Sequence, residues 1–541
     1  MRKRLLSSCT LAIGALLFAS CRPNSGISIR DQATLDQILL LGNEAEAASL
    51  DPHLNTSNSG SKCITTLIEG LIAYHPSDDN LPEPGVAESW EHKDYTLWTF
   101  HLRKNARWSN ADPVTSQDFV YSYQRILSPE LGGNYAEMLH IIKGATAFNR
   151  GEDLDFSHVS VKALDTHTLQ IELVGPTPYF LNLIKHHAWH PVHPPTIEKY
   201  GGMTKPDSTW TRDEYIGNGP YTIKEWTLNK VLKVEKNPLY WDADTVTIQE
   251  IHFFPITDIS SEDHLFNSGG LHYASTIPSD MIPVYKKNKD PYLRLEPWFA
   301  SYFFKINVTL PHLSDKRVRR ALSMAVNRRA ITKRIMKGDQ AIALSLTPPG
   351  AANYDAPHTL GFNPKHARKL LAEAGYPNGK GFPKMTLLYN TSDQHKAVTE
   401  AIQEMWINIL GIEVEIRNQE WKTYLQSQDQ LDYDISRAGW IGDYPYPDTF
   451  LNMFRTGDGN NRTGWGDARY DTLLKESFTE TDATRRLEML CKAESILVEE
   501  LPVIPLYYYR RIYRIDPAVK GWYPKRLDNR NYKYIRLTPK S

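Results

Sequence analysis

The densest group of side chains that can do chemistry is a histidine cluster in the segment KHHAWHPVH. Its members are His186, His187, His190 and His193. Neutral imidazoles bind transition metals, so this spacing is compatible with a metal site. However, prolines make the segment stiff and irregular, and on a loop the spacing does not place the rings on one face. Because metal ligands usually come from separated segments, we favour polar loop packing over a metal site.

The cysteines offer no recognisable metal or redox motif. Cys9 falls within the first twenty residues and Cys21 directly follows them, which leaves Cys63 and Cys491. There is no C-x-x-C pair, and the sequence leaves open whether these two cysteines form a disulfide. Nucleophile elbows, zinc-hydrolase motifs, Walker loops and dinucleotide fingerprints are also missing, which lowers the expectation of an enzyme without excluding one. We predict that the chain is not an enzyme and needs no cofactor.

Length and composition narrow the class of protein. The chain has 541 residues, so two or three packed units are expected. Formal net charge is -1, without the basic excess that nucleic-acid binding demands. We therefore expect a multidomain globular protein that has no nucleic-acid partner.

The N-terminus has the pattern of a secretory signal. Three basic residues at positions 2–4 precede the apolar run 11–19, which is too short to span a bilayer. The run ends in Phe18-Ala19-Ser20-Cys21, which resembles a bacterial lipobox except for its first position. We predict a lipoprotein signal peptide over residues 1–20 and lipidation of Cys21. The alternative is ordinary cleavage nearby, with Cys21 a bystander.

The periodicity of apolar residues predicts alternating strands and helices. Residues 96–103 and 169–173 alternate in steps of two, as strands do. Helical spacing follows a start signal at Ser314–Asp315, and further helices are expected over 363–375, from about 396 to a stop at Gly411, and over 482–500. A strand at 412–416 follows Gly411 directly. The predicted class is α/β.

Five sequence blocks carry a resemblance to a known family. They are LDPH (50–53), TFHLRKNARWSNADPVTSQDFVYSYQR (99–125), LLYNTSDQHK (387–396), NQEWKTY (418–424) and RAGWIGDY (437–444). Together they resemble the oligopeptide-binding proteins of bacterial peptide ABC transporters, the family 5 extracytoplasmic solute-binding proteins. The resemblance implies a two-lobed periplasmic-binding-protein clamp of the cluster C type with an additional domain.

The same resemblance implies how the chain is divided. Lobe I takes residues 22–68, 194–299 and 509–541, the additional domain II takes 69–193, and lobe III takes 300–508. The chain then crosses between the lobes near Trp298 and Tyr508, and these crossings are expected to form the hinge.

The resemblance also assigns binding residues for a peptide's N-terminal half. Asp443 stands where the family pairs an aspartate with the α-ammonium group, although a turn residue before Tyr444 is the alternative. Gly439 and Trp440 stand where backbone groups bind the peptide as a neighbouring strand. Trp421 matches a tryptophan that walls a side-chain pocket.

Two cationic positions and two tyrosines complete the expected site. Arg437 and His395 match residues that face the ligand's carboxyl end, with membership of an internal ion pair as the alternative. Tyr135 and Tyr508 match aromatic or hydroxyl contacts. A slip of one residue would exchange Tyr508 with a neighbouring tyrosine.

Some positions depart from the family pattern. Gln428 replaces an arginine, Met336 replaces a lysine, and Thr56-Ser57-Asn58 replace acidic and apolar residues. These changes make the carboxyl end of the site less cationic and point to a different or narrower class of peptide.

The sequence therefore predicts a periplasmic, membrane-anchored monomer that captures short peptides and delivers them to inner-membrane ABC permease subunits. Within the same clamp, the alternative ligands are muropeptide, dipeptide, haem or a nickel chelate. Two further hypotheses are a metal hydrolase that uses the histidine cluster and a surface adhesin or chaperone.

Overall fold

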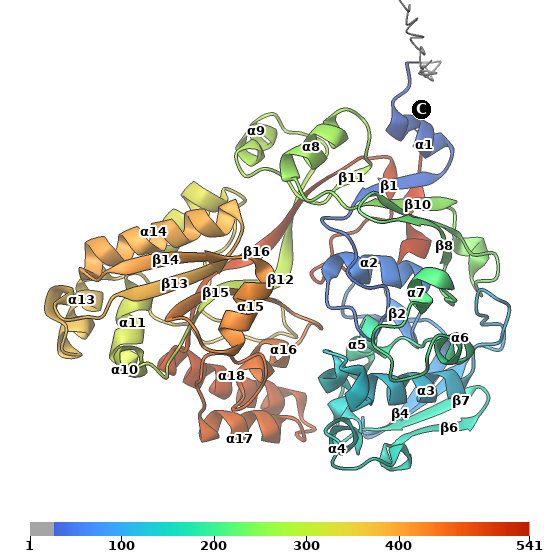
Figure 1. The fold of residues 1–541 in the computed structure, drawn as a ribbon, viewed down its shortest axis with the longest axis horizontal. Coiled ribbons are helices and arrows are strands. Elements are labelled where there is room, and N and C mark those ends of the chain that lie inside the picture. The colour runs from blue at the N-terminus through green and yellow to red at the C-terminus, as the bar shows by residue number, and fades with distance from the viewer. Residues whose placement is uncertain (1–25, 540–541) are drawn as a thin grey trace, which may run out of the picture.

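The computed structural model describes residues 26–539 and shows two bodies joined by two long strands (Figure 1). These strands, β12 (Leu293–Ile306) and β16 (Val503–Ile515), are antiparallel neighbours. They lie inside one ten-stranded sheet of order β14-β13-β15-β12-β16-β11-β1-β10-β9-β8. The predicted α/β, two-lobed clamp is confirmed. The predicted signal peptide and Cys21 lie outside the described residues.

One half of the large sheet belongs to the right-hand body of Figure 1. It contains β1 (Ile38–Gly42), β8 (Tyr221–Thr227), β9 (Val231–Lys236), β10 (Glu250–Phe254) and β11 (Tyr273–Ala274). Leu39 and Ile251 are register partners on parallel strands β1 and β10, and both are fully buried. These apolar strands bury their side chains against α2 (Asn58–Leu67).

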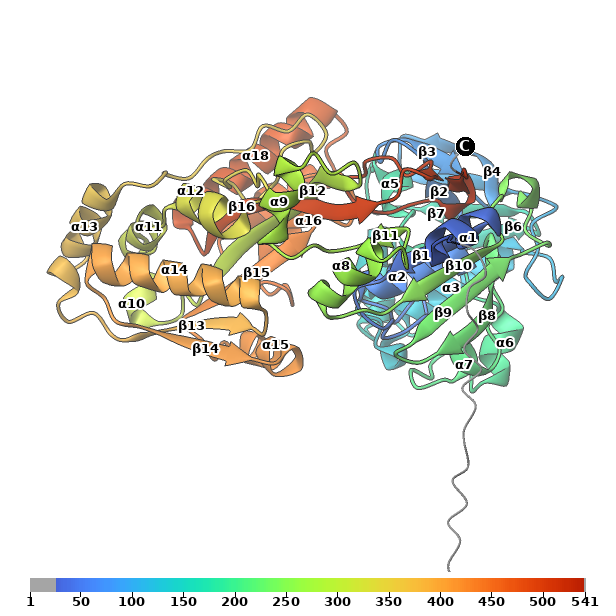
Figure 2. The ribbon, with the colours of Figure 1, turned by 90° about the horizontal axis from the view of Figure 1, so that it is seen from above.

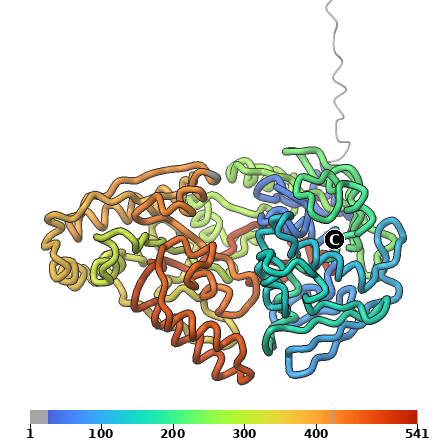
Figure 3. Tube along the Cα trace, turned by 60° about the horizontal axis from the view of Figure 1, so that its bottom comes forward, coloured from blue at the N-terminus to red at the C-terminus, as the bar shows by residue number. Residues whose placement is uncertain are grey.

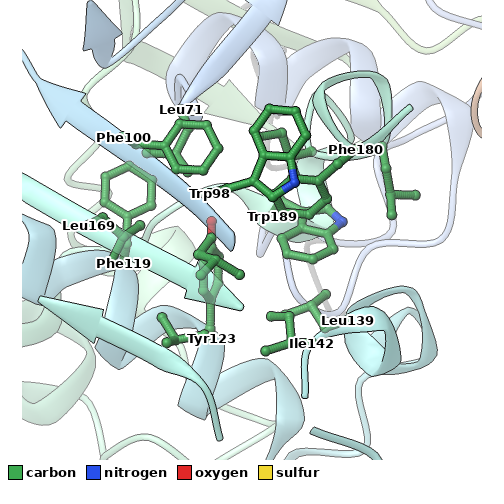
Figure 4. Packing of buried hydrophobic residues seen from close by; sticks show 14 of the residues in the cluster. Leu71, Trp98, Phe100, Phe119, Tyr123, Leu139, Ile142, Leu169, Phe180 and Trp189 are labelled. Atoms are coloured by element: carbon green, nitrogen blue, oxygen red, sulfur yellow. The ribbon is translucent and has the colours of Figure 1, made fainter. Parts of the chain in front are cut away.

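The right-hand body also contains a separate antiparallel sheet of four strands. It is ordered β4 (Ala87–Lys93), β5 (Leu97–Leu102), β7 (Thr168–Glu172) and β6 (Val161–Asp165), so the strands predicted over 96–103 and 169–173 are confirmed. Helix α3 (Ser116–Leu127) begins with a capping box between Thr115 and Asp118. Figure 4 shows Trp98, Phe100 and Tyr123 packed together in this core.

The left-hand body holds a second group of parallel strands of the large sheet. β13 (Met385–Asn390) runs parallel to both β14 (Val414–Gln419) and β15 (Ile435–Ile441). Alternation along β12 sends Tyr302 and Phe304 into one core and Phe299 and Phe303 into the other. Helices α11 (Lys316–Met324), α13 (Pro364–Glu373) and α14 (Asp393–Leu410) contribute to the first core, and α17 (Ala468–Ser477) and α18 (Ala483–Glu500) to the second.

The helix signals in this body function as the sequence predicts. Asp315, Asn363 and Asp482 cap the starts of α11, α13 and α18 with their side chains. Gly411 ends α14 with a φ of 72°, a left-handed conformation that glycine adopts readily. No helix among residues 26–539 is long and apolar enough to cross a bilayer.

The two bodies also touch away from the long strands. Seen from below, the teal chain near residue 180 and the orange chain near residue 445 lie side by side (Figure 3). Tyr179, just before α5 (Phe180–Leu183), stacks on Tyr444 and Tyr446 with ring centroids 5.4 and 4.8 Å apart. Its hydroxyl donates to Asp448, the first residue of α16 (Asp448–Leu451), at 2.8 Å. The bodies are therefore in direct contact on the side that carries Asp443.

Candidate functional site

The predicted site residues of the left-hand body follow the carboxyl ends of its parallel strands. β13 leads through Asn390 to His395 in the first turn of α14, and β14 leads to Trp421 at the start of α15 (Trp421–Asp429). The third strand, β15, itself carries Arg437. Ligands of open α/β sheets bind at this edge, so the topology brings together residues that are far apart in sequence.

Arg437 is a buried cation without a carboxylate partner. Only 9% of its surface is exposed, and among the described residues no carboxylate oxygen lies within 4.0 Å of its guanidinium. It donates to Asn390 Oδ1 at 3.2 Å and to the Tyr509 hydroxyl at 2.7 Å, and its Nε has no partner. The guanidinium also lies 4.9 Å from the Tyr302 ring centroid. Burying a cation without a counter-charge is costly, so this geometry suits an anionic ligand group.

His395 lies beside Arg437 but is itself neutral. Its Nδ1 is 3.4 Å from the Tyr302 hydroxyl, and desolvation together with the Arg437 charge lowers the pKa of His395 to about 2. At neutral pH this imidazole can exchange hydrogen bonds with a ligand but adds no positive charge.

Asp443 is the complementary case, a carboxylate without a cation. Its Oδ2 accepts from the Thr449 hydroxyl at 3.2 Å, and its backbone N–H donates to Thr449 Oγ1 at 3.0 Å. No Lys, Arg or His nitrogen among the described residues lies within 4.0 Å of the carboxylate. Desolvation raises the pKa of Asp443 to about 7. An entering ammonium group would supply the missing charge.

Between these two charges, one edge of β15 is free of strand pairing. β12 pairs with β15 along its whole length, whereas β13 pairs only with Ile435 and Ser436. Beyond Ser436, the β13 side of Gly439 and Trp440 therefore has no neighbouring strand in the described chain. A Cβ at Gly439 would lie 3.0 Å from the Tyr509 hydroxyl and 3.4 Å from Ser301 O, so this stretch suits close backbone approach.

The other predicted residues occupy distinct places around this edge. Trp421 is 52% exposed and stacks on Tyr424 with centroids 5.5 Å apart. Tyr135 comes from the right-hand body, packs edge-on against His186 at 4.7 Å, and has its pKa raised by desolvation and by the Asp443 charge. The charge of Asp443 therefore acts on Tyr135 from the other body.

Tyr508 lies away from Arg437. Its hydroxyl is 2.5 Å from Ser345 Oγ, and burial raises the pKa of Tyr508 to about 12. Tyr509, the next residue, is the one that binds Arg437. The sequence left open an exchange of Tyr508 with a neighbouring tyrosine. Which of the two rings points to the guanidinium depends on the register of β16 with β12, which the sequence does not give.

Two of the family departures, Gln428 and Met336, have their contacts within the protein. Gln428 Nε2 donates to the Tyr424 hydroxyl at 2.7 Å, to Ser436 Oγ at 2.8 Å and to the Arg437 carbonyl at 3.1 Å. Met336 is 2% exposed in the core shared with α11 and α14. Neither residue supplies a charge to the site.

The histidine cluster is built into loop packing. His187 shares hydrogen bonds with Asn55 and Ser61, and His193 lies 2.8 Å from Thr196 Oγ1 and 3.0 Å from Asp112 Oδ2. No group of three or more metal-ligating side chains with metal-site geometry occurs within residues 26–539. Cys63 and Cys491 are both free thiols.

Comparisons with known proteins show the family of this chain. Residues 82–462 match the model of the bacterial extracellular solute-binding proteins, family 5 Middle. The chain is 35% identical to the periplasmic oligopeptide-binding protein OppA of Escherichia coli over 517 residues, covering 93% of this chain and 92% of the relative.

Solved structures give the same result. The murein tripeptide binding protein MppA of Escherichia coli superposes with a TM-score of 0.82 at 32% identity, covering 92% of this chain and 98% of MppA. The unliganded open form of MppA gives 0.72 at 33% identity, covering 93% and 97%. Haemophilus influenzae OppA in complex with RPPGFSPFR gives 0.81 at 30% identity, covering 93% and 99%. The family comprises binding proteins rather than enzymes, and this chain belongs to it: it is a family 5 bacterial extracellular solute-binding protein.

Proposed function

We propose that this protein is an extracytoplasmic substrate-binding lipoprotein that captures short peptides and delivers them to an ABC importer. Lipidation would occur at Cys21 after removal of residues 1–20. OppA relatives named for oligopeptide binding, and a relative solved with a bound peptide, support the ligand class. The chain itself would catalyse no reaction.

The observation that carries the proposal is a pair of opposite charges, one on β15 and one just beyond its end. Arg437 lacks a carboxylate and Asp443 lacks a cation in the described chain, and Asp443 lies six positions after Arg437. At full extension six residues span at most about 20 Å, which an extended peptide of a few residues can fill. Its ammonium would meet Asp443, its carboxylate would meet Arg437, and its backbone would pair with the free edge of β15.

The arrangement of the two bodies supports a ligand-enclosing state. The structure matches MppA with a TM-score of 0.82 but the open form of that protein with only 0.72. In the observed arrangement, Tyr135 and Tyr179 of the right-hand body reach the segment that follows β15. Closure would therefore bring domain II against the peptide's N-terminal end.

We also propose the domain limits expected from the sequence, with a hinge near Trp298 and Tyr508. The pairing of β12 with β16 supports this position, because the register shifts between Pro297 and Ser301. Such an irregularity interrupts the ladder where a few torsions must absorb the motion. Figure 2 shows both strands crossing between the bodies at this place.

A narrower ligand class is the second candidate. Of the four described residues expected at the carboxyl end, only Arg437 is charged. Gln428 and Met336 have uncharged side chains that contact other parts of the protein, and His395 is neutral. The smaller positive charge would weaken binding least for a ligand whose carboxylate is modified or distant, such as a murein peptide. MppA, which is named for that ligand, is among the relatives.

The deciding experiment is mass spectrometry of small molecules released by denaturing the purified mature protein, beside Asp443→Ala. Mixed short peptides from wild type, strongly reduced in the variant, would support general peptide capture and the ammonium contact together. A single murein peptide would favour the narrower class. A non-peptide retained equally by both proteins would contradict the proposal.

A further inference from the structure

One stretch of the left-hand body has an unusual charge composition. Residues 316–337 contain nine Lys or Arg and no Asp or Glu, in a chain whose formal net charge is -1. The cations of α11 are largely neutralised, since Lys316 and Arg320 pair with Glu499 and Arg317 pairs with Asp315. The second half of the stretch, in and after the π-helix η6 (Ile331–Met336), is not neutralised in this way.

Two elements from different bodies combine their cations beside the long strands, five of them exposed and Lys337 half-buried. We call this set the hinge-side patch; it consists of Lys286, Lys287 and Lys289 from α9 (Met281–Lys287) and the turn after it, and Lys333, Arg334 and Lys337 from η6 and the residue after it. Asp339 joins the two elements, because Lys286 lies 2.5 Å and Lys333 lies 3.9 Å from its carboxylate. No described carboxylate lies within 4.0 Å of Lys287, Lys289 or Arg334.

The patch lies on the same edge of the molecule as the first described residues. Helices α1 (Ile29–Leu35), α8 (Ile259–Asn267) and α9 line the upper edge of Figure 1 and lie towards the viewer in Figure 2. Gly26, the first described residue, is five residues from Cys21, a distance of at most about 18 Å when extended. A lipid at Cys21 would hold this edge close to the bilayer.

The same edge also exposes apolar side chains of the kind that enter a lipid interface. They are Ile29 (71% exposed), Leu35 (54%), Ile259 (44%) and Val284 (43%). Lysines beside scattered aliphatic side chains are typical of surfaces that lie on anionic membranes. The charge acts within about a Debye length of 8 Å, so a lipid anchor that holds this edge near the bilayer would strengthen its effect.

We propose that the hinge-side patch binds the headgroups of anionic phospholipids and orients the clamp on the membrane. The placement of this edge near the bilayer rests on the lipid anchor of the proposed function, whereas the positive charge of the patch does not depend on the anchor. Each cation near an anionic surface strengthens binding by roughly fivefold. Because the patch draws on both bodies beside the long strands, contact with the membrane would leave the peptide-binding edge of β15 free.

The test is co-sedimentation of the full mature chain carrying Cys21→Ser with phosphatidylcholine vesicles that contain or lack 30% phosphatidylglycerol. The patch variant K287E/K289E/R334E removes three cations without touching the Asp339 pairs. The matched control K365E/R368E/K380E makes the same charge change in α13 and the segment after it, at the far end of the left-hand body.

We expect wild type and the control to bind the anionic vesicles, the patch variant to bind at least roughly 100-fold more weakly, and 0.5 M NaCl to abolish binding. Equal losses in both variants would overturn the proposal, because net charge would then explain the effect. The proposal would also be overturned if wild type does not bind anionic vesicles while the patch variant lowers peptide import in cells. That result would favour an acidic protein partner for the patch. Peptide affinity is measured on the same proteins. Absence of peptide binding would contradict the proposed function, whereas normal peptide binding without vesicle binding would contradict only the role of the patch.

Discussion

Burying the unpaired charges of Asp443 and Arg437 costs free energy in the empty protein, and that cost explains why they suit the binding of a charged ligand. A carboxylate with its pKa raised to about 7 and a buried guanidinium without a counter-ion are both relieved by opposite charges. A zwitterionic ligand supplies both at once. Neutral side chains at these positions would be cheaper for folding but would recognise neither end of a peptide.

The first prediction concerns the pH dependence set by Asp443. Below pH 7 the empty site holds a proton that an incoming ammonium must displace, so peptide affinity is full above pH 7 and falls towards tenfold per unit below it. Above about pH 8 the ligand's α-amino group loses its charge and affinity falls again. Calorimetric titrations of a tetrapeptide between pH 5 and 9 measure both limbs.

Asp443→Asn is the control for that profile. It should bind weakly and lose the slope between pH 6 and 7, while a slope below pH 6 would remain from Asp448, whose pKa burial raises to about 6. An unchanged profile in this variant would show that another group titrates.

A second prediction pairs Arg437 with the ligand's carboxylate. Arg437→Gln should weaken a free tetrapeptide by about 30-fold or more, the loss typical of a buried charge partner, and should barely affect the C-terminally amidated peptide. Arg469→Gln, on the exposed α17, is the matched control. If both peptides lose equal affinity, Arg437 acts through the packing of Tyr302 and Tyr509 and does not bind the carboxylate.

At the scale of elements, the unpaired edge of β15 is the feature that a peptide would extend. Gly439→Ala places a Cβ 3.0 Å from the Tyr509 hydroxyl, which must then shift slightly and so disturb its hydrogen bond from Arg437. We expect about tenfold weaker peptide binding at nearly unchanged thermal stability. Gly361→Ala, where a Cβ meets nothing within 4 Å, should leave affinity unchanged. Full affinity in Gly439→Ala would mean that the peptide does not depend on this edge.

Individual elements were predictable because their signals are local. Asn363 and Gly411 mark helix ends through side-chain capping and a left-handed turn, and the alternation near residue 100 marks a buried strand. The partners of the site residues were not predictable in this way. That Asn390 and Tyr509 meet Arg437 depends on the parallel alignment of β13 with β15 and on a shifted register between β12 and β16. Such pairings are set by the whole sheet.

At the scale of the whole molecule, one segment, residues 443–448, both contains the proposed ligand contact and joins the two bodies. Asp443 directly precedes Tyr444, which is buried in the core of the right-hand body, and Asp448 accepts from Tyr179. Arg486 adds a second link by donating to the Pro176 carbonyl at 2.5 Å. A peptide bound at Asp443 would therefore act on the chain that holds the bodies together, and closure would lower the rate at which the peptide leaves.

The last prediction separates this contact from simple packing. Tyr179→Phe keeps both ring stacks and removes only the hydroxyl that donates to Asp448, so we expect a fewfold faster peptide dissociation with little change in association. Tyr179→Ala should remove the stacks as well and expand the peptide-bound protein in small-angle scattering. Tyr215→Phe removes a comparable hydroxyl bond, to the Leu50 carbonyl, inside the right-hand body, and should change neither measurement. Because opening must break the Tyr179 contacts before the peptide can leave, unchanged dissociation in Tyr179→Ala would mean that the long strands alone set the balance between open and closed states.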